Sequence, residues 1–370
     1  MSKKECVLVA MSGGVDSSVA LHLLVAEGYD AVGVTLKLWD YQDSAGTFTR
    51  PSYCCSLEAV RNAKLVCDTA GVPHYTLDFR KKFLEKVVEN FAAEYQQGRT
   101  PNPCIRCNTE VRWTALLEYA NELDMAWMAT GHYARLDRSN PNHPVIRKGL
   151  DPRKDQSYVL WQLDQKALAR TLFPLGSLTK PEVRKIAQQA HLATAGIAES
   201  QEICFVPNNN YREFLDGRNP SPNTANGQGW FITPEGELLA KHQGISHYTI
   251  GQRRGLGVTG SEPVYVQKID PESGNITLAP RRSLFFKGCQ VNNLNWHMDE
   301  AQLDHLEAIT VLIRYHHEGV GCRLARHGSG LLNVQFDEPQ FAVTPGQSAV
   351  FYSGDLLLGG GIITAGTLHE

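Results

Sequence analysis

Cys6-Val7-Leu8-Val9-Ala10-Met11-Ser12-Gly13-Gly14-Val15-Asp16-Ser17-Ser18 is the stretch that decides the fold of this chain. Its apolar first part, residues 6–10, predicts a buried strand of a parallel sheet, and residues 17–27 predict an amphipathic helix. Between them, the glycine pair lets backbone N–H groups turn toward one point. The serine hydroxyls and the helix N-terminus favour an anion there. The stretch therefore predicts a phosphate-binding loop, although the lysine of the ordinary P-loop is missing.

The hexapeptide Ser12-Gly13-Gly14-Val15-Asp16-Ser17, placed after a first strand, resembles the pyrophosphate-binding loop of the PP-loop ATP pyrophosphatases. In that superfamily the loop holds the β and γ phosphates of ATP while a substrate attacks the α phosphate. The resemblance implies that Asp16 helps to hold Mg²⁺, which usually accompanies a triphosphate and takes few protein ligands. The alternative is a plain strand-to-helix turn with Asp16 as a cap.

Length and composition point to a cytoplasmic protein without a membrane partner. The 370 residues carry a net charge of −3 and include nine cysteines. No apolar run reaches transmembrane length, and the N-terminus lacks the apolar segment of a signal peptide. In a reducing compartment the cysteines indicate catalysis or metal binding rather than a disulfide framework. The weak negative charge leaves only local basic patches for nucleic acid.

Strands and helices are predicted to alternate along the first part of the chain, which is typical of an α/β fold with a doubly wound parallel sheet. In such sheets, ligands bind at the carboxyl ends of the strands. Beyond Pro207, short alternating runs predict small β domains or a barrel. We expect three domains: a PP-loop catalytic domain at 1–207, a small central domain at 208–279 and a C-terminal β-barrel at 280–370.

Three cysteines on predicted loops suggest chemistry. Cys104 and Cys107 form a CxxC pattern. By itself, this pattern is compatible with a redox pair, half of a zinc site or two unrelated core thiols. Cys107 is predicted near a helix N-terminus, which favours its thiolate. Cys204 follows about a hundred residues later. Reactive thiols in an ATP-activating domain suggest sulfur transfer, in which a persulfide displaces an adenylate and a second thiol breaks the S–S bond.

Further motifs make the resemblance close. The chain resembles the MnmA family of tRNA-specific 2-thiouridylases, a branch of the PP-loop superfamily, over nearly its full length. The motifs that carry this resemblance, in chain order, are the hexapeptide above, Cys54-Cys55-Ser56, Thr100-Pro101-Asn102-Pro103 with Ile105 and Cys107-Asn108, Thr130-Gly131-His132-Tyr133-Ala134, Lys154-Asp155-Gln156-Ser157-Tyr158, Ser200-Gln201 with Ile203-Cys204-Phe205, His247-Tyr248-Thr249-Ile250-Gly251-Gln252-Arg253, Arg314-Tyr315, and Pro345-Gly346-Gln347.

The resemblance implies ATP-dependent 2-thiolation of the wobble uridine in tRNAs of the Lys, Glu and Gln type. It implies a PP-loop domain, a small central domain and a C-terminal barrel. The implied cofactors are ATP and Mg²⁺, and the implied sulfur donor is a cysteine desulfurase or a sulfur-relay protein. Cys107 falls at the nucleophile and Cys204 at the persulfide carrier, and the two would form a disulfide after turnover. The positions that fall at ATP contacts are Ala10, Met11, Ser12, Gly13, Gly14, Val15, Asp16, Ser17, Leu36 and Gly131. Those that fall at tRNA contacts are Asn102, Pro103, Cys104, His132, Lys154, Asp155, Gln156, Arg314, Tyr315 and Gln347.

One position departs from the family pattern. Cys104 stands where the family commonly has Asp, to which a general acid/base or base-positioning role is assigned. Either that carboxylate is dispensable, or another group such as Asp155 replaces it, or the chemistry differs. Cys104, Cys107 and Cys204 together could hold an iron–sulfur cluster with one open iron, as in some related tRNA-thiolating enzymes.

Two other classes of function stay open from the residues. One is a PP-loop enzyme of the amidotransferase or ligase type that acts on a small molecule and needs neither Cys107 nor Cys204. The other is an RNA-binding or redox-sensing protein without catalysis, in which the cysteines only switch. Several motif residues also have plain structural readings. His132 could cap a strand end, and Lys154-Asp155-Gln156 could be a surface turn.

Overall fold

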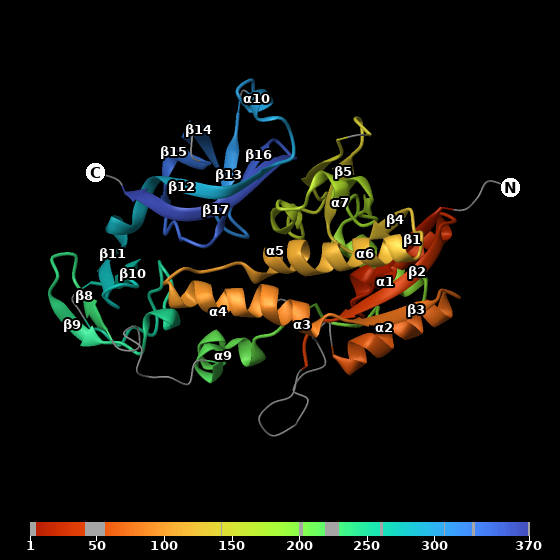
Figure 1. The fold of residues 1–370 in the computed structure, drawn as a ribbon, viewed down its shortest axis with the longest axis horizontal. Coiled ribbons are helices and arrows are strands. Elements are labelled where there is room, and N and C mark those ends of the chain that lie inside the picture. The colour runs from red at the N-terminus through yellow and green to blue at the C-terminus, as the bar shows by residue number, and fades with distance from the viewer. Residues whose placement is uncertain are drawn as a thin grey trace. The chain divides into compact units, whose positions relative to one another are not determined.

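The computed structural model describes residues 5–40, 56–141, 143–199, 203–218, 229–259, 262–306, 308–327 and 330–368 (Figure 1). The chain divides into two compact units. Unit 1 consists of Met1–Val88, Cys104–Phe205 and Asp355–Leu357, and unit 2 of Glu89–Pro103, Val206–Gly354 and Leu358–Glu370. The predicted three-domain division stays a prediction.

Unit 1 contains a five-stranded sheet in the order β3-β2-β1-β4-β7, and each neighbouring pair is parallel. The strands are β1 Cys6–Ala10, β2 Asp30–Lys37, β3 His74–Asp78, β4 Trp127–Ala129 and β7 Thr171–Leu172. The predicted doubly wound parallel sheet is therefore confirmed. The inner strands β1 and β2 are mostly buried, as expected for a parallel sheet covered by helices, whereas the edge strand β3 is largely exposed.

Side-chain alternation along β1 explains how the helices are distributed. Val7 and Val9 pack with residues of α1 (Val15–Ala26) and α2 (Leu57–Thr69) in one buried cluster. Successive side chains of a strand point to opposite faces, so Leu8 points to the other face. There α6 (Thr114–Glu122) contacts β1 and β4 (Figure 1).

Two longer helical segments contain π turns. In the first, α3 (Arg80–Phe83) continues through η1 (Leu84–Val88) into α4 (Glu89–Gln96). In the second, α5 (Pro103–Cys107) continues through η2 (Asn108–Trp113) into α6. Single π turns inside helices are frequent at functional sites, and η2 begins directly after Cys107.

The remaining elements of unit 1 are short. In the sequence, Val159, Leu160 and Leu163 predict a helix after Gln156, but the structure has only the 3-10 turn η3, Ser157–Leu160. By contrast, Thr179 and Pro181 predict the start of a helix over 181–190, with Thr179 as its N-cap. This start is confirmed by α8 (Lys180–Gln189), in which Thr179 is the N-cap and forms a capping box with Glu182. The other elements are β5 Ala134–Asp137, β6 Val145–Lys148 and α7 Gln165–Ala169, and β6 pairs with Leu356.

Unit 2 contains a four-stranded sheet and a barrel. The sheet has the order β10-β11-β8-β9, with β8 Trp230–Ile232, β9 Leu238–Lys241, β10 Val264–Ile269 and β11 Ile276–Pro280. The barrel strands follow the order β12-β15-β14-β13-β16-β17, and pairing of β12 with β17 closes the ring. This confirms the C-terminal barrel. Its strands are β12 Phe285–Trp296, β13 Thr310–Leu312, β14 Val320–His327, β15 Leu331–Phe341, β16 Ser348–Ser353 and β17 Leu356–Leu368.

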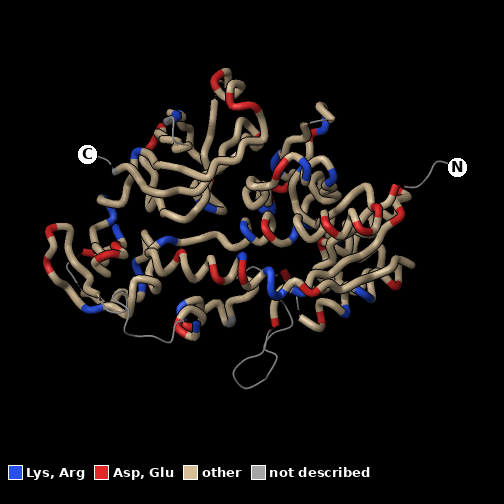
Figure 2. Tube along the Cα trace, viewed as in Figure 1, with Lys and Arg blue, Asp and Glu red and all other residues tan. Residues whose placement is uncertain are grey.

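Unit 2 also contains the short helices η4 Pro207–Asn209, α9 Tyr211–Arg218, η5 Ile245–His247, η6 Arg281–Leu284 and α10 Glu300–Leu303. Of these, η6 connects the four-stranded sheet to the barrel. Acidic and basic residues are interspersed in both units, as the small net charge suggests (Figure 2). Among the described residues, none of the helices has the combined length and apolar character needed to span a membrane.

The sequence predicts Trp113 and Trp161 in the core, and it predicts Cys6, Cys67, Cys289 and Cys322 as small buried apolar side chains. Trp113, Trp161, Cys67, Cys289 and Cys322 are buried, which confirms five of these predictions. The prediction for Cys6 is wrong, because this first residue of β1 is only partly buried. Burial raises the pKa of each of the three buried thiols, Cys67, Cys289 and Cys322, to about 12. These cysteines therefore behave as small apolar side chains rather than as nucleophiles.

Candidate nucleotide and thiol site

The glycine loop lies between the end of β1 and the start of α1. Gly13 has φ +75°, and a Cβ at this position would lie 2.1 Å from the carbonyl oxygen of Ala59. Both facts require glycine here, because other residues rarely adopt this backbone conformation and the carbonyl cannot move away cheaply. Gly14 is the N-cap of α1 and has no side chain to cap the helix. The first N–H groups of α1 are thus available to an anion.

The serine hydroxyls, which we expected to add donors for phosphate, bond within the loop. The Ser17 hydroxyl accepts a hydrogen bond from the Ser12 N–H at 3.1 Å and donates to the Gly14 carbonyl at 3.2 Å. The Ser18 hydroxyl donates to the same carbonyl at 2.9 Å. These side chains therefore shape the loop, and their contact with phosphate stays a prediction.

The other predicted ATP contacts gather at the carboxyl ends of neighbouring strands. Ala10 ends β1, Leu36 lies near the end of β2, and Met11 bonds through its N–H to the Val34 carbonyl at 2.8 Å. Gly131 follows β4, and a Cβ there would lie 2.8 Å from the Ser17 nitrogen. This is the strand edge at which open α/β sheets bind ligands.

Asp16, the acidic residue of the loop, is surrounded by partners. Lys180 Nζ donates to Asp16 Oδ1 at 2.6 Å and to Oδ2 at 2.8 Å. The Tyr133 hydroxyl donates to Oδ1 at 2.7 Å. Burial, and secondly the Asp16 carboxylate, raise the pKa of Tyr133, which stays protonated as a donor. The sequence-based prediction gave Asp16 to Mg²⁺ alone and missed both partners.

Lys180 connects Asp16 to a second carboxylate. Its Nζ lies 2.9 Å from Glu199, which also bonds to Lys154 and lies 3.8 Å from Arg184. One feature of the sequence indicates this cluster of charges. A lysine in the first turn of a helix opposes the helix dipole, so Lys180 needs carboxylates close by.

The thiols of α5 differ in exposure. Cys107 is buried, with 6% of its surface exposed, whereas Cys104 is exposed. Cys204 is intermediate. The position of Cys107 in the first turns of a helix agrees with the sequence. Its thiolate character and its pairing with Cys204 stay predictions.

The predicted tRNA residues near β5 form internal bonds. Gln156 accepts a hydrogen bond from the Tyr133 N–H at 3.0 Å. Asp155 accepts from the Gly149 N–H at 2.9 Å and from the Ser157 N–H at 3.1 Å and hydroxyl at 2.8 Å. These bonds fit the turn reading of this motif. A role in tRNA contact stays a prediction.

His132 lies among aromatic rings. Its ring is 5.4 Å from that of Trp113 and 6.3 Å from that of Phe173, and its Nδ1 is 2.9 Å from the Thr130 hydroxyl. Burial, and secondly Arg112, lower the pKa of His132 to about 3. The ring is therefore neutral at physiological pH, and its contact to tRNA stays a prediction.

In unit 2, Asn102 and Pro103, which are predicted to meet the target base, lie close in sequence to Thr100, which is held by hydrogen bonds. Gln347 Nε2 donates to the Thr100 carbonyl at 2.8 Å, and the Thr100 N–H donates to the Pro345 carbonyl at 2.9 Å. The Thr100 hydroxyl lies 3.2 Å from that of Thr249. The structure thus brings Gln347 to the segment that leads into Asn102 and Pro103.

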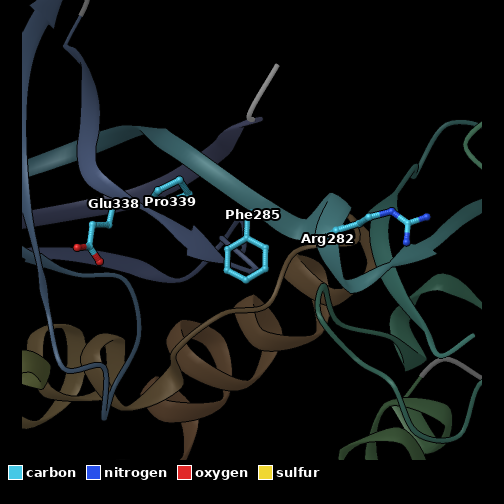
Figure 3. Close-up of a pocket in the computed structure, with 4 residues that line it drawn as sticks. All are labelled: Arg282, Phe285, Glu338 and Pro339. Carbon is cyan, nitrogen blue, oxygen red and sulfur yellow. The ribbon is translucent and has the colours of Figure 1, made fainter.

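Arg314 and Tyr315 lie in another part of unit 2. Arg314 donates to the Phe341 carbonyl at 3.2 Å and borders a polar hollow of about 440 Å³ with His316 and His317. A second hollow, of about 550 Å³, is lined by Arg282, Phe285, Glu338 and Pro339 (Figure 3). It contains none of the predicted site residues.

Parts of two motifs lie outside the described residues, namely Cys54-Cys55 and Ser200-Gln201. Among the residues that are described, no three His, Cys, Asp or Glu side chains group together to hold a metal ion. The iron–sulfur alternative, which needs three thiols together, therefore gains no support from the geometry. For Mg²⁺, Asp16 offers a carboxylate beside the loop, but Lys180 engages both of its oxygens. Phosphate oxygens would have to be the main ligands of the ion.

The parallel sheet, with its Ser-Gly-Gly-Xaa-Asp-Ser loop at the first strand, defines this chain as a PP-loop α/β protein. Three family models match it: "tRNA methyl transferase HUP domain" over 5–208, "tRNA methyl transferase PRC-barrel domain" over 220–280 and "Aminomethyltransferase beta-barrel domain" over 286–363. The chain is 44% identical over 366 residues to the tRNA-specific 2-thiouridylase MnmA of Salinibacter ruber, covering 98% of this chain and 95% of that protein. It is 45% identical over 360 residues to that of Carboxydothermus hydrogenoformans, covering 96% and 97%.

The chain belongs to the tRNA-specific 2-thiouridylase (MnmA) family. The predicted class, a tRNA sulfurtransferase of the PP-loop type, is confirmed by this membership. Solved structures align loosely: an NMN synthetase from Francisella tularensis covers 60% of this chain and 80% of its own at 17% identity, with a TM-score of 0.33. A likeness of that size carries no functional argument.

Proposed function

We propose that this chain replaces O2 of the wobble uridine of tRNA with sulfur, at the expense of ATP. The proposal rests chiefly on family membership over nearly the full chain at 44% identity. It is supported by the glycine loop, where Gly13 and Gly14 leave N–H groups of α1 available to phosphate. Asp16 and Lys180 supply the charges beside that loop.

In the first step, uridine O2 attacks the α phosphorus of ATP, the bond to the β phosphate breaks, and pyrophosphate leaves. Backbone N–H groups at the start of α1 stabilise the leaving group. Mg²⁺, when bound, would neutralise part of the phosphate charge. The product is a uridine whose O2 carries AMP, a good leaving group.

In the second step, a persulfide on Cys204 attacks C2, and AMP leaves with the former O2. The base is then joined to Cys204 through an S–S bond. The Cys107 thiolate attacks the Sγ of Cys204, the bond to the transferred sulfur breaks, and 2-thiouridine is released. Cys107 and Cys204 end as a disulfide, which a cellular thiol reductant must reduce. A cysteine desulfurase or a relay protein supplies the next persulfide sulfur.

The target base must leave its stack to reach these groups, as enzymes that act on bases require. Phosphate contacts make the binding of tRNA salt-dependent. The residues proposed for tRNA contact are Asn102, Pro103, Cys104, His132, Lys154, Asp155, Gln156, Arg314, Tyr315 and Gln347. The hydrogen bond from Gln347 to the Thr100 carbonyl supports a fixed position for Asn102 and Pro103, which follow Thr100 closely in the chain.

The test is nucleoside analysis of an unmodified lysine tRNA transcript after anaerobic incubation with the protein, Mg-ATP, a cysteine desulfurase and cysteine. We expect 2-thiouridine with the wild type and with Cys6→Ser, a control in β1, and none with Cys204→Ser. Formation of AMP without a thiolated base would refute the proposal and favour a ligase-type enzyme. Bound iron that is lost together with activity in Cys104→Ser would replace the persulfide route by a cluster route.

A further inference from the structure

Lys180 is placed where a lysine is costly. It is the first residue of α8, and only 7% of its surface is exposed. A buried ammonium loses hydration, and at a helix N-terminus it also opposes the helix dipole. A side chain kept there against both effects needs close counter-charges, and Asp16 and Glu199 provide them at 2.6 and 2.9 Å.

The Lys180 ammonium also lies beside the phosphate loop. Asp16 is the second residue of α1, two positions after Gly14 of the glycine pair. In ordinary P-loops a lysine inside the loop meets the β and γ phosphates. That lysine is missing from the loop here, and Lys180 of α8 brings an ammonium to within 2.6 Å of Asp16, beside the loop.

We propose that Lys180 is the phosphate-binding lysine of this site. When Mg-ATP binds, Nζ transfers its hydrogen bonds from Asp16 to the β and γ phosphates, and an Asp16 oxygen becomes available to Mg²⁺. This deepens the proposed function and depends on its ATP requirement.

The surrounding charges make this transfer cheap. After it, Asp16 keeps the hydrogen bond from the Tyr133 hydroxyl at 2.7 Å and gains the metal ion. Glu199 keeps its ion pair with Lys154 and has Arg184 at 3.8 Å. Neither carboxylate is left without a counter-charge or donor, which would be the main cost of breaking a buried pair.

The experiment is calorimetric binding of ATP, pyrophosphate and AMP, each with Mg²⁺, to the full chain. The variant is Lys180→Met, and Lys185→Met is the matched control, because Lys185 lies on the same helix and is exposed. We expect Lys180→Met to weaken ATP and pyrophosphate 10- to 100-fold, as for a lost charged hydrogen bond, and AMP less than twofold. Lys185→Met should bind all three as the wild type does.

If Lys180→Met fails to fold, the double variant with Asp16→Asn and Lys180→Met is used instead, because it removes both charges of the pair. Its reference is the single variant Asp16→Asn. The expected result is again a selective loss of pyrophosphate affinity. Equal weakening of ATP and AMP would mean that Lys180 only holds the fold, and unchanged binding of ATP would exclude the phosphate contact. Both overturn the inference while the proposed function stands. A wild type that binds no ATP would overturn the proposed function itself.

Discussion

Replacing Gly131 by alanine should disturb the nucleotide site by a steric clash alone. A Cβ at Gly131 would lie 2.8 Å from the Ser17 nitrogen, 2.9 Å from the Asp16 carbonyl carbon and 3.2 Å from the Asp16 Cβ. Two of these three atoms are backbone in the first turn of α1, so no flexible side chain can give way for them. Overpacking of this kind costs about 1–3 kcal/mol.

The cost can be measured as a shift in melting temperature. A destabilisation of 1 kcal/mol lowers the melting temperature by about 2–4 °C for a domain of 150–250 residues, so Gly131→Ala should lower it by roughly 2–12 °C. Because relief of the clash pushes the start of α1 away, we also expect a smaller rise of the melting temperature on addition of Mg-ATP. Differential scanning fluorimetry measures both quantities.

Gly196→Ala is the control, since a Cβ there meets nothing within 4 Å and the backbone needs no glycine conformation. It should melt as the wild type does or slightly higher. The steric reasoning is refuted if Gly131→Ala melts within 1 °C of the wild type and responds equally to ATP.

Three further predictions follow from the site. Burial is the chief reason why the pKa of His132 is lowered to about 3 in the folded chain. As the pH falls from about 6.5 to 3, the unfolded chain therefore binds a proton at this residue before the folded chain does. The free energy of unfolding falls over this pH range. His132→Gln should remove up to about 1.4 kcal/mol of this loss per pH unit, measured by urea unfolding; an unchanged slope contradicts it. Gln347→Ala, which loses the bond to Thr100, should cost about 1 kcal/mol and slow thiolation without weakening ATP; weaker ATP binding argues against this. At pH 8 iodoacetamide should label the exposed Cys104 and spare Cys67, whose pKa is raised to about 12 by burial; equal labelling by mass spectrometry excludes it.

The local parts of the fold could be predicted because the identity of neighbouring residues determines each of them. The strand, glycine loop and helix of residues 6–26 follow from a short apolar run and two glycines. The start of α8 follows from Thr179 and Glu182, which form a capping box. Such patterns determine what a segment becomes, but they do not say which distant segment it meets.

The charge cluster could not be predicted because its partners are far apart in the chain. Asp16 and Lys180 are separated by 164 positions, and Thr100 and Gln347 by 247. Neither pair lies within one motif, and pairing depends on how strands order in the sheet. Family resemblance marked Gln347 as functional, but only the fold links it to Thr100. The family resemblance did not mark Lys180, and its one sign in the sequence is a lysine in the first turn of a predicted helix.

Cys104 stands at a position where the family resemblance leads us to expect an aspartate. Asp155 was one candidate to replace the missing carboxylate, but its oxygens accept three hydrogen bonds from Gly149 and Ser157. A carboxylate held in that way stabilises a turn, and moving it to a base would leave buried donors of the turn unsatisfied, at a cost of about 1–3 kcal/mol for each. Cys104 itself is exposed, so water reaches this position directly. In the proposed reaction we therefore expect water, rather than Asp155, to accept the proton that the uridine would lose on adenylation.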